Sequence, residues 1–243
     1  MRKIEGKNPV FEALNGDTVV DTIYINKEMA EGMVSKITKL AKERNIPIKY
    51  VDKDKLMKLS EGGRHQGVIA VAEEFEYKEI NDILELANKK NEKPFVIILD
   101  EITDVHNLGA VIRTAECLGA HGVIIPKRRA ASVNSVVAKT SAGAVEYLPV
   151  ARVTNINQAI EELKEKGLWI YGADMLGEKY INEEKLDGAI GIVIGNEGKG
   201  ISRLTKEKCD TLIKIPMKGN ITSLNASCAA SIIIYEVLRQ RGI

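Results

Sequence analysis

Five polar side chains, in three separate stretches of the chain, could act together on a substrate: Asn107, Arg113, Glu197, Ser223 and Asn225. They include no Ser-His-Asp set, no paired aspartates and no cluster with metal-ligand spacing. Polar groups without a strong nucleophile or a metal suit the positioning of two bound substrates. The sequence therefore predicts group transfer without a metal, in preference to hydrolysis.

The first stretch, residues 100–116, reads DEITDVHNLGAVIRTAE. Its apolar residues recur at helical spacing and predict a helix over 107–118 with one buried face. Asn107 is placed to cap this helix, and Arg113 lies off the apolar stripe. We expect both side chains to project from one end of the helix toward the strand ends. The alternative is an ordinary capped helix in which Arg113 pairs with Glu116.

The second stretch, residues 191–205, reads GIVIGNEGKGISRLT, and its glycines surround Glu197. The glycine spacing does not fit G-x-G-x-x-G. The Walker A pattern also fails, because Lys199 is followed by Gly200 where Ser or Thr is needed. A loop that wraps an uncharged, adenosine-like group is therefore a better hypothesis than a phosphate-binding loop. A plain strand–helix turn with one exposed Glu is the alternative.

The third stretch, residues 215–236, reads IPMKGNITSLNASCAASIIIYE. A strand-like approach stops at Pro216, a polar loop follows, and a helix of small residues starts near Ser223 to Asn225. A helix start with free N–H groups and little bulk allows a ligand or another backbone to come close. The alternative is a capped C-terminal helix that packs on a sheet.

Alternating strands and helices position these stretches. Strands are predicted at 95–100, 122–126, 145–150, 168–174, 189–195 and 211–216, and helices at 107–118, 133–142, 155–166, 201–208 and 223–240. Several of the strands are apolar without alternation, as expected where both faces of a sheet are covered. The pattern predicts a parallel, doubly wound α/β sheet, whose ligands bind at the carboxyl ends of the strands.

The N-terminal part predicts a second, smaller α/β unit, with strands at 19–25, 46–51 and 67–72 and a helix at 28–44. Residues 73–94 are highly charged and end at a proline, which is typical of a connection. The predicted division is 1–75 as a substrate-binding domain, 76–94 as a linker and 95–243 as the catalytic domain. Lysines of the small unit could contact phosphates, or form a solvated face. Arg64 and His65 lie in a glycine-rich loop, read either as a turn or as an RNA-contacting loop.

Composition narrows the class of protein. The 243 residues carry a net charge of +1, so nucleic-acid contact must come from local patches. Three distant cysteines without a C-x-x-C pair indicate reduced thiols, and we find neither a signal peptide nor a run long enough to cross a bilayer. We therefore expect a cytoplasmic protein. His106 and His121 are isolated and are predicted to be structural or exposed.

Three motifs carry a family resemblance. NLGAVIRTA, IGNEGKGI and IPMKGNITSLNASCAASIIIYE resemble, in the right order, the three motifs of the SpoU (TrmH) family of S-adenosylmethionine-dependent RNA ribose 2′-O-methyltransferases. The match covers most of 95–243; Val105 stands where many members have a proline. GKNPVFEAL, HQGV and PKRRAASVNSVVAKTSAGAVE look closest to the RlmB-type subgroup, which acts on a guanosine of bacterial 23S rRNA.

The resemblance implies a particular fold and assembly. The catalytic domain should contain a deep C-terminal trefoil knot, an exception to the rule that chains are unknotted. Backbone around Gly195, Ile215 and Leu224 would hold the adenine and ribose of S-adenosylmethionine, with Ile194 and Met217 beside them. The N-terminal domain would be ribosomal-protein-like and bind RNA. The enzyme would be a homodimer, and the small residues Ala226, Ala229 and Ala230 would allow two helices to meet closely.

The resemblance also implies roles for the polar residues. Arg113 would assist proton loss from the ribose hydroxyl, or else grip the neighbouring phosphate, with Asn107, Glu197, Ser223 and Asn225 around it. Lys127, Arg128 and Arg129 are expected to contact the RNA backbone, unless they form a solvated turn. The leading hypothesis is methylation of a 23S rRNA guanosine. The alternatives are the same chemistry on tRNA, and a non-catalytic RNA-binding or ribosome-assembly protein on the same fold.

Overall fold

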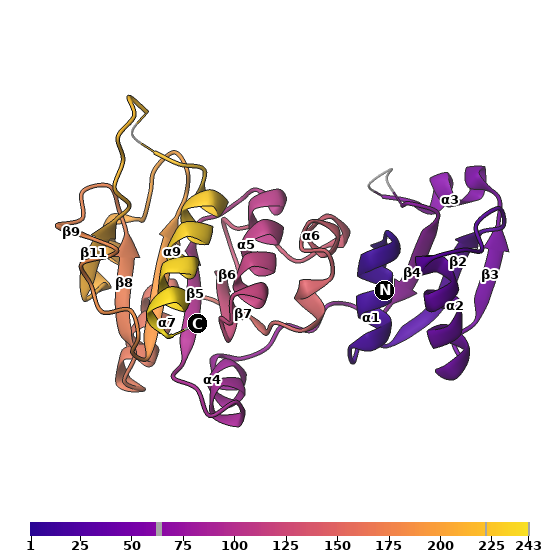
Figure 1. Ribbon diagram of the computed structural model, residues 1–243, viewed down its shortest axis with the longest axis horizontal. Helices are drawn as coiled ribbons and strands as arrows, with labels where there is room; N and C mark the ends of the chain where they lie inside the picture. Colours follow the sequence, from indigo (N-terminus) through magenta and orange to yellow (C-terminus); the bar gives the residue numbers. More distant parts are fainter. Residues whose placement is uncertain (62–64, 222, 243) are drawn as a thin grey trace. The chain divides into compact units, whose positions relative to one another are not determined.

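The computed structural model describes residues 1–61, 65–221 and 223–242, and the chain forms two compact units (Figure 1). Unit 1 comprises Met1–Glu76 together with Ser132–Tyr147. Unit 2 comprises Tyr77–Ala131 and Leu148–Ile243. Each unit has its own sheet and its own hydrophobic core.

Unit 1 contains a mixed four-stranded sheet in the order β1-β4-β2-β3. Its strands are β1 (Arg2–Glu5), β2 (Val20–Asn26), β3 (Ile48–Val51) and β4 (Val68–Ala72), and its helices are α1 (Lys7–Asn15), α2 (Met33–Glu43) and α3 (Lys53–Leu59). Strands β2, β3 and β4 and helix α2 confirm the predicted elements. The sequence analysis missed β1, α1 and α3, which are too short to show a periodic pattern.

Residues 132–147 belong to unit 1, although the sequence analysis assigned them to the catalytic domain. They form α6 (Ser135–Thr140) and the 3-10 turn η1 (Ala144–Glu146), where a strand had been predicted from Val145. Arg2 and Glu146 form an ion pair at 2.8 Å, with their side chains 9% and 2% exposed. This buried pair joins residues that are far apart in sequence, so no local pattern indicates which unit the segment joins.

The predicted linker is also part of a folded unit. It contains α4 (Ile80–Lys89), whose Ile80 and Ile83 lie in the core of unit 2. A Cβ added at Gly122 would lie 2.5 Å from Cγ1 of Ile83, which shows how closely α4 approaches the sheet. The charged residues of 73–94 therefore mark the exposed side of a packed helix as well as a connection.

Unit 2 contains a seven-stranded sheet in the order β7-β6-β5-β10-β8-β11-β9, and all pairings between these strands are parallel. The strands are β5 (Phe95–Asp100), β6 (Gly122–Pro126), β7 (Val150–Val153), β8 (Trp169–Ala173), β9 (Lys179–Tyr180), β10 (Ile190–Gly195) and β11 (Thr211–Lys214). The parallel α/β sheet is confirmed. Strand β5 is buried along its whole length, as its unbroken apolar run predicts.

Helices cover the sheet of unit 2: α5 (Val105–Cys117), α7 (Ile156–Glu165), α8 (Arg203–Lys208) and α9 (Ala226–Gln240). Helices α5 and α9 lie side by side, joined by a 3.1 Å hydrogen bond between the hydroxyls of Thr114 and Ser231 (Figure 1). Ala226 and Ala230 of α9 are buried within this chain, where α9 packs against α5. Packing inside one subunit therefore already accounts for their small size. No helix in the described part of the chain is long and apolar enough to cross a membrane.

Candidate functional site

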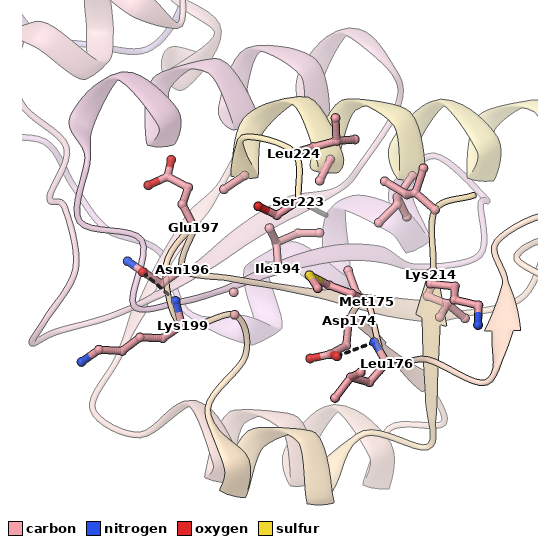
Figure 2. A pocket seen from close by; sticks show the side chains of 18 of the residues that line it. Asp174, Met175, Leu176, Ile194, Asn196, Glu197, Lys199, Lys214, Ser223 and Leu224 are labelled. Atoms are coloured by element: carbon pink, nitrogen blue, oxygen red, sulfur yellow. Dashed lines mark hydrogen bonds between the residues drawn. The ribbon is translucent and has the colours of Figure 1, made fainter. Parts of the chain in front are cut away.

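A cavity of about 470 Å³ lies where β8, β10 and β11 end, and Figure 2 shows the side chains around it. Its wall consists of residues 173–176, 194–200, 213–215, Lys206, Met217, 223–224 and part of α9. This is the edge of a parallel sheet at which ligands bind, and the volume suits a small molecule or cofactor. The cavity therefore lies at the sheet edge where the strand–helix pattern predicts that a ligand binds.

The cavity brings together most of the residues predicted to bind a cofactor or to act in catalysis. The ones that line it are Ile194, Gly195, Glu197, Ile215, Met217, Ser223 and Leu224. They come from the second and third sequence stretches, which are separated by α8 and β11. The structure therefore places these residues around one space; their chemical roles are taken up below.

The glycine-rich loop closes tightly on itself. Asn196 and Gly200 exchange two backbone hydrogen bonds, of 3.1 and 2.7 Å. A Cβ added at Gly195 would lie 2.2 Å from the backbone carbon of Gly200, so only glycine fits there. Gly200 itself has a φ of +66°, in the region that favours glycine. The glycines thus serve close backbone approach, as the sequence predicted.

Asn196 organises this loop and was not singled out from the sequence. Its Oδ1 accepts hydrogen bonds from the backbone N–H groups of Gly198, at 2.9 Å, and Lys199, at 3.4 Å (Figure 2). Its Nδ2 donates to the carbonyl of Glu101 at 3.1 Å. The side-chain amide of Asn196 therefore joins the loop after β10 to the loop after β5. The signal was available, since Asn is a common turn-forming residue.

Glu197 is the centre of a hydrogen-bonded cluster, which we call the Asn–Glu–Asn cluster: Asn107, Glu197 and Asn225. Oε1 of Glu197 accepts hydrogen bonds from Nδ2 of Asn107 and, at 3.1 Å, from Nδ2 of Asn225. Its Oε2 bonds to no other residue that the structure describes. The side chain is exposed, so one carboxylate oxygen stays available to a substrate. Three of the five polar residues predicted to act together thus meet directly.

Asn107 reaches Glu197 for a reason that the sequence analysis did not foresee. Helix α5 begins at Val105, and the cap is Asp104, whose side chain accepts from the backbone N–H of His106. The prediction that Asn107 caps the helix was therefore wrong. Asn107 lies in the first turn, only 7% exposed, and its amide is free to donate to Glu197.

Asn225 does two things at once. Its Oδ1 caps α9 by accepting hydrogen bonds from the N–H groups of Ser227, at 3.0 Å, and Cys228, at 3.3 Å. Its Nδ2 donates to Glu197. The predicted cap is confirmed, and the helix start fixes the direction in which the amide points.

Arg113 lies apart from this cluster. It follows Asn107 by six residues, which corresponds to about 9 Å along the helix and about 120° around it. The two side chains therefore do not project from one end of the helix, as had been expected. Arg113 is exposed and forms no ion pair with Glu116 or with any other described residue. No described hydrogen bond connects it to Glu197, Ser223 or Asn225.

The residues predicted to contact RNA fall into two groups. Lys127, Arg128 and Arg129 follow β6 and are exposed, and Arg129 pairs with Glu101 at 3.2 Å. His65 is only 7% exposed, and its Nδ1 accepts the backbone N–H of Gly67 at 3.0 Å. Its burial supports the turn reading and argues against contact with RNA. Arg64 lies outside the described residues.

The cavity wall contains further residues that the sequence analysis did not select. Asp174, Met175 and Leu176 follow β8, and Lys206 comes from α8. Met175 and Leu176 are 55% and 80% exposed, so their apolar side chains are accessible at the cavity wall. The signal was positional: Asp174 ends a predicted strand at the sheet edge that binds ligands.

Two ionisable groups beneath the sheet edge have strongly shifted pKa values. Burial, with the nearby Asp210 carboxylate, raises the pKa of Cys209 to about 12. Burial, with Glu184, raises the pKa of Tyr171 to about 12. Cys209 is therefore protonated at neutral pH and cannot serve as a nucleophile. In the described part of the chain, no group of His, Cys, Asp and Glu has an arrangement that could hold a metal ion.

Comparison with known proteins assigns the chain. Residues 94–235 match the SpoU rRNA Methylase family, and residues 3–78 match a domain described as RNA 2′-O ribose methyltransferase substrate binding. The chain belongs to the SpoU rRNA methylase family. The resemblance drawn from the three motifs is thereby confirmed. The two family matches fall on either side of residues 79–93, which include the whole of α4.

Two relatives of this SpoU-family chain cover nearly its whole length, and a third covers about two thirds of it. The putative TrmH family tRNA/rRNA methyltransferase YacO of Bacillus subtilis is 47% identical over 98% of this chain and 95% of its own. The SpoU methyltransferase AviRb of Streptomyces viridochromogenes, solved in complex with AdoMet, is 27% identical with a TM-score of 0.84, over 98% of this chain and 89% of its own. An A. aeolicus TrmH/SpoU tRNA-modifying enzyme is 28% identical with a TM-score of 0.56, over 66% of this chain and 83% of its own.

Proposed function

We propose that this SpoU-family protein transfers the methyl group of S-adenosylmethionine to the ribose 2′-hydroxyl of a guanosine in 23S rRNA. The observation that carries the proposal is the Asn–Glu–Asn cluster at the edge of the cavity. Glu197 both lines the cavity and is held by Asn107 and Asn225. A positioned carboxylate beside a cofactor-sized cavity is what group transfer between two bound molecules requires.

The cavity fits S-adenosylmethionine by its size and its lining. It combines apolar side chains, among them Ile194, Met217 and Leu224, with the polar backbone of the glycine-rich loop. An adenosine group needs both, since its ring is flat and apolar and its edges form hydrogen bonds. AviRb, which resembles this chain over almost its whole length, was solved with this donor bound. When bound, the donor supplies an electrophilic methyl group on a sulfonium.

The side chains of this protein would orient and activate the acceptor. A ribose hydroxyl is a weak nucleophile at neutral pH and needs a partner that draws its proton away. The free Oε2 of Glu197 can accept that hydroxyl as a hydrogen-bond donor, with Asn107 and Asn225 holding the carboxylate in place. The exposed hydroxyl of Ser223, which also lines the cavity, is a further polar group available to the bound molecules.

For Arg113 we propose a grip on the phosphate next to the target ribose. An arginine guanidinium stays positively charged at neutral pH, which makes it a poor general base and a good bidentate phosphate ligand. Its exposed, unpaired position on α5 agrees with a partner that arrives with the RNA. The same contact would stabilise negative charge developing on the ribose oxygen.

We further propose that unit 1, with the substrate-binding match, and the exposed Lys127, Arg128 and Arg129 bind the RNA backbone.

The proposal includes a homodimer, supported by Ile232 and Tyr235 of α9, which are 40% and 58% exposed although they are apolar or aromatic. It also includes the trefoil knot around the glycine-rich loop and residues 215–224, and a cytoplasmic location.

The test is methyl transfer from labelled S-adenosylmethionine to unmodified 23S rRNA, with tRNA in parallel, followed by identification of the modified nucleoside by mass spectrometry. We expect 2′-O-methylguanosine in the rRNA. Label in tRNA alone would overturn the substrate and keep the chemistry. Absence of donor binding would contradict the enzyme proposal and favour an RNA-binding or ribosome-assembly protein.

A further inference from the structure

Asp174 is a carboxylate that the mechanism above does not use, although it lies in the cavity wall. Its side chain is 6% exposed, and both of its oxygens have partners. Oδ1 accepts the backbone N–H of Leu176 at 2.9 Å (Figure 2). Oδ2 lies 2.5 Å from Nζ of Lys206. Carboxylates this buried are uncommon unless they are paired and hydrogen-bonded, as this one is.

These contacts join separate pieces of the cavity wall. The bond to Leu176 shapes the turn after β8, and the turn closes with a 3.0 Å bond from the N–H of Gly177 to the carbonyl of Asp174. The ion pair holds the turn to α8 through Lys206, which is itself part of the wall. A Cβ added at Gly200 would lie 3.8 Å from Oδ2 of Asp174, so the carboxylate lies near the glycine-rich loop without a hydrogen bond to it among the described residues.

The turn itself has little room to move. The N–H of Asp174 donates to the carbonyl of Ile213 at 2.9 Å, which binds the turn to β11. A Cβ added at Gly177 would lie 2.8 Å from the backbone of Ile213, so the chain passes directly against that strand. The exposed side chains of Met175 and Leu176 are thereby held at the mouth of the cavity.

We propose that Asp174, acting through its ion pair with Lys206, is a positioning residue for the methyl donor. It holds the turn 174–177 against α8, beside the glycine-rich loop, in the arrangement that receives the donor, so the site is formed before binding. A preformed site avoids the free-energy cost of ordering these segments when the donor binds. This inference rests on the proposed function, because it concerns the same cavity.

The chain supplies matched controls for both members of the pair. Asp210 is another largely buried aspartate, with its side chain 15% exposed; it pairs with Lys164 at 2.7 Å and accepts the N–H of Ile170 at 2.8 Å. Lys208, two residues after Lys206, pairs with Glu161 at 2.6 Å. The cavity wall includes none of the residues of these two control pairs, Asp210 with Lys164 and Lys208 with Glu161.

The experiment measures binding of S-adenosylmethionine and S-adenosylhomocysteine by calorimetry, together with thermal unfolding of the unliganded protein. Its variants are Asp174→Asn, Lys206→Met and Lys206→Arg, with Asp210→Asn and Lys208→Met as controls. We expect Asp174→Asn and Lys206→Met to weaken donor binding by about tenfold, the effect of losing one charge-assisted contact. Lys206→Arg should bind the donor as the unmodified protein does, because an arginine also forms an ion pair with Asp174. KM for the donor should rise, whereas kcat at saturating donor should change much less.

The controls separate positioning from stability. Asp210→Asn should lower thermal stability about as much as Asp174→Asn, whereas Lys208→Met, which breaks an exposed pair, should change it little. Both controls should leave the donor affinity unchanged. Donor affinity in Asp174→Asn equal to that in Asp210→Asn would overturn the inference while leaving the proposed function intact. Absence of donor binding by the unmodified protein would instead overturn the proposed function. If Asp174→Asn does not fold, the comparison of Lys206→Met with Lys206→Arg decides the question alone.

Discussion

Nδ2 of Asn225 lies 3.1 Å from Oε1 of Glu197, while Oδ1 of the same amide caps α9. One side chain therefore joins the start of a structural helix to the carboxylate at the centre of the site. Because Asn225 both caps α9 and donates to Glu197, the loop before α9 must place this residue where its amide reaches both groups. The two roles use different atoms, so they can be separated by substitution.

Asn225→Asp should keep the cap and lose the donor. Aspartate caps a helix as well as asparagine does, but its second oxygen would repel Glu197 instead of donating to it. We expect thermal stability close to that of the unmodified protein and a single-turnover rate of methyl transfer lower by about 100-fold. Thermal unfolding and single-turnover transfer at saturating donor check the two expectations.

Asn155→Ala is the matched control. Asn155 caps α7 through the N–H of Asn157 at 2.9 Å and has no part in the cavity. It should lose about 1 kcal/mol of stability with no change in the rate of transfer. A full rate in Asn225→Asp would show that its contact with Glu197 is dispensable.

Gly195→Ala should disrupt donor binding. The added methyl group would meet the backbone of Gly200 and Ile201 at 2.2 Å, and a backbone cannot rotate away as a side chain can. We expect a loss of about 3 kcal/mol in the free energy of unfolding and a large loss of donor affinity. Gly198→Ala is the control in the same loop, since its nearest neighbour would be Oδ1 of Asn196 at 3.5 Å. Equal donor affinity in the two variants would contradict the close approach.

Arg113→Ala should abolish turnover and leave donor binding nearly intact. If the guanidinium grips a phosphate, the slope of RNA affinity against salt concentration should also fall by about one. Arg113→Lys should bind RNA but transfer slowly, because a lysine cannot make the bidentate contact. RNA binding measured over a range of salt concentrations checks the grip. Unchanged activity in Arg113→Ala would remove this residue from the mechanism.

His121 should make the stability of unit 2 depend on pH. Its ring is fully buried, Nδ1 accepts the N–H of Phe95, and burial lowers the pKa of His121 below 6.5 despite its contact with Glu92. Below pH 6.5 the unfolded chain therefore binds a proton that the folded chain resists. Stability should be complete above that pH and fall as the pH decreases toward the lowered pKa.

Urea unfolding at several pH values measures this dependence. His121→Asn should be less stable at every pH, because Phe95 loses its acceptor, and should show a weaker decline at acidic pH. A decline as steep as that of the unmodified protein would assign the pH dependence to another group.

Local patterns predicted the catalytic half of the fold well, because buried parallel strands such as β5 are continuous apolar runs. They failed where membership of a unit depends on distant contacts. Helix α4 is highly charged, yet Ile83 packs under Gly122. The segment with Glu146 belongs to unit 1 because Arg2 pairs with it, and no periodicity records such a pair.

The candidate site likewise contains residues that local patterns identified and residues whose importance depends on distant contacts. Glu197 and Asn225 were found because glycines and a helix start surround them. Asn107 was selected for a cap that Asp104 provides, and the true reason, its bond to Glu197, joins residues ninety positions apart. Asp174 was missed because its position at the end of a strand was its only signal in the sequence. Its contacts with Lys206 and Leu176, which give it significance, are visible only in the structure.

The most direct test of this account is single-turnover methyl transfer to 23S rRNA by Glu197→Gln, compared with the unmodified protein at saturating donor. Glu207→Gln, at an exposed position of α8, is the control. We predict 2′-O-methylguanosine from the unmodified protein and from Glu207→Gln, and a rate lower by about 100-fold or more in Glu197→Gln with donor binding retained. A full rate in Glu197→Gln, or a methyl group on the base instead of the ribose, would contradict the account.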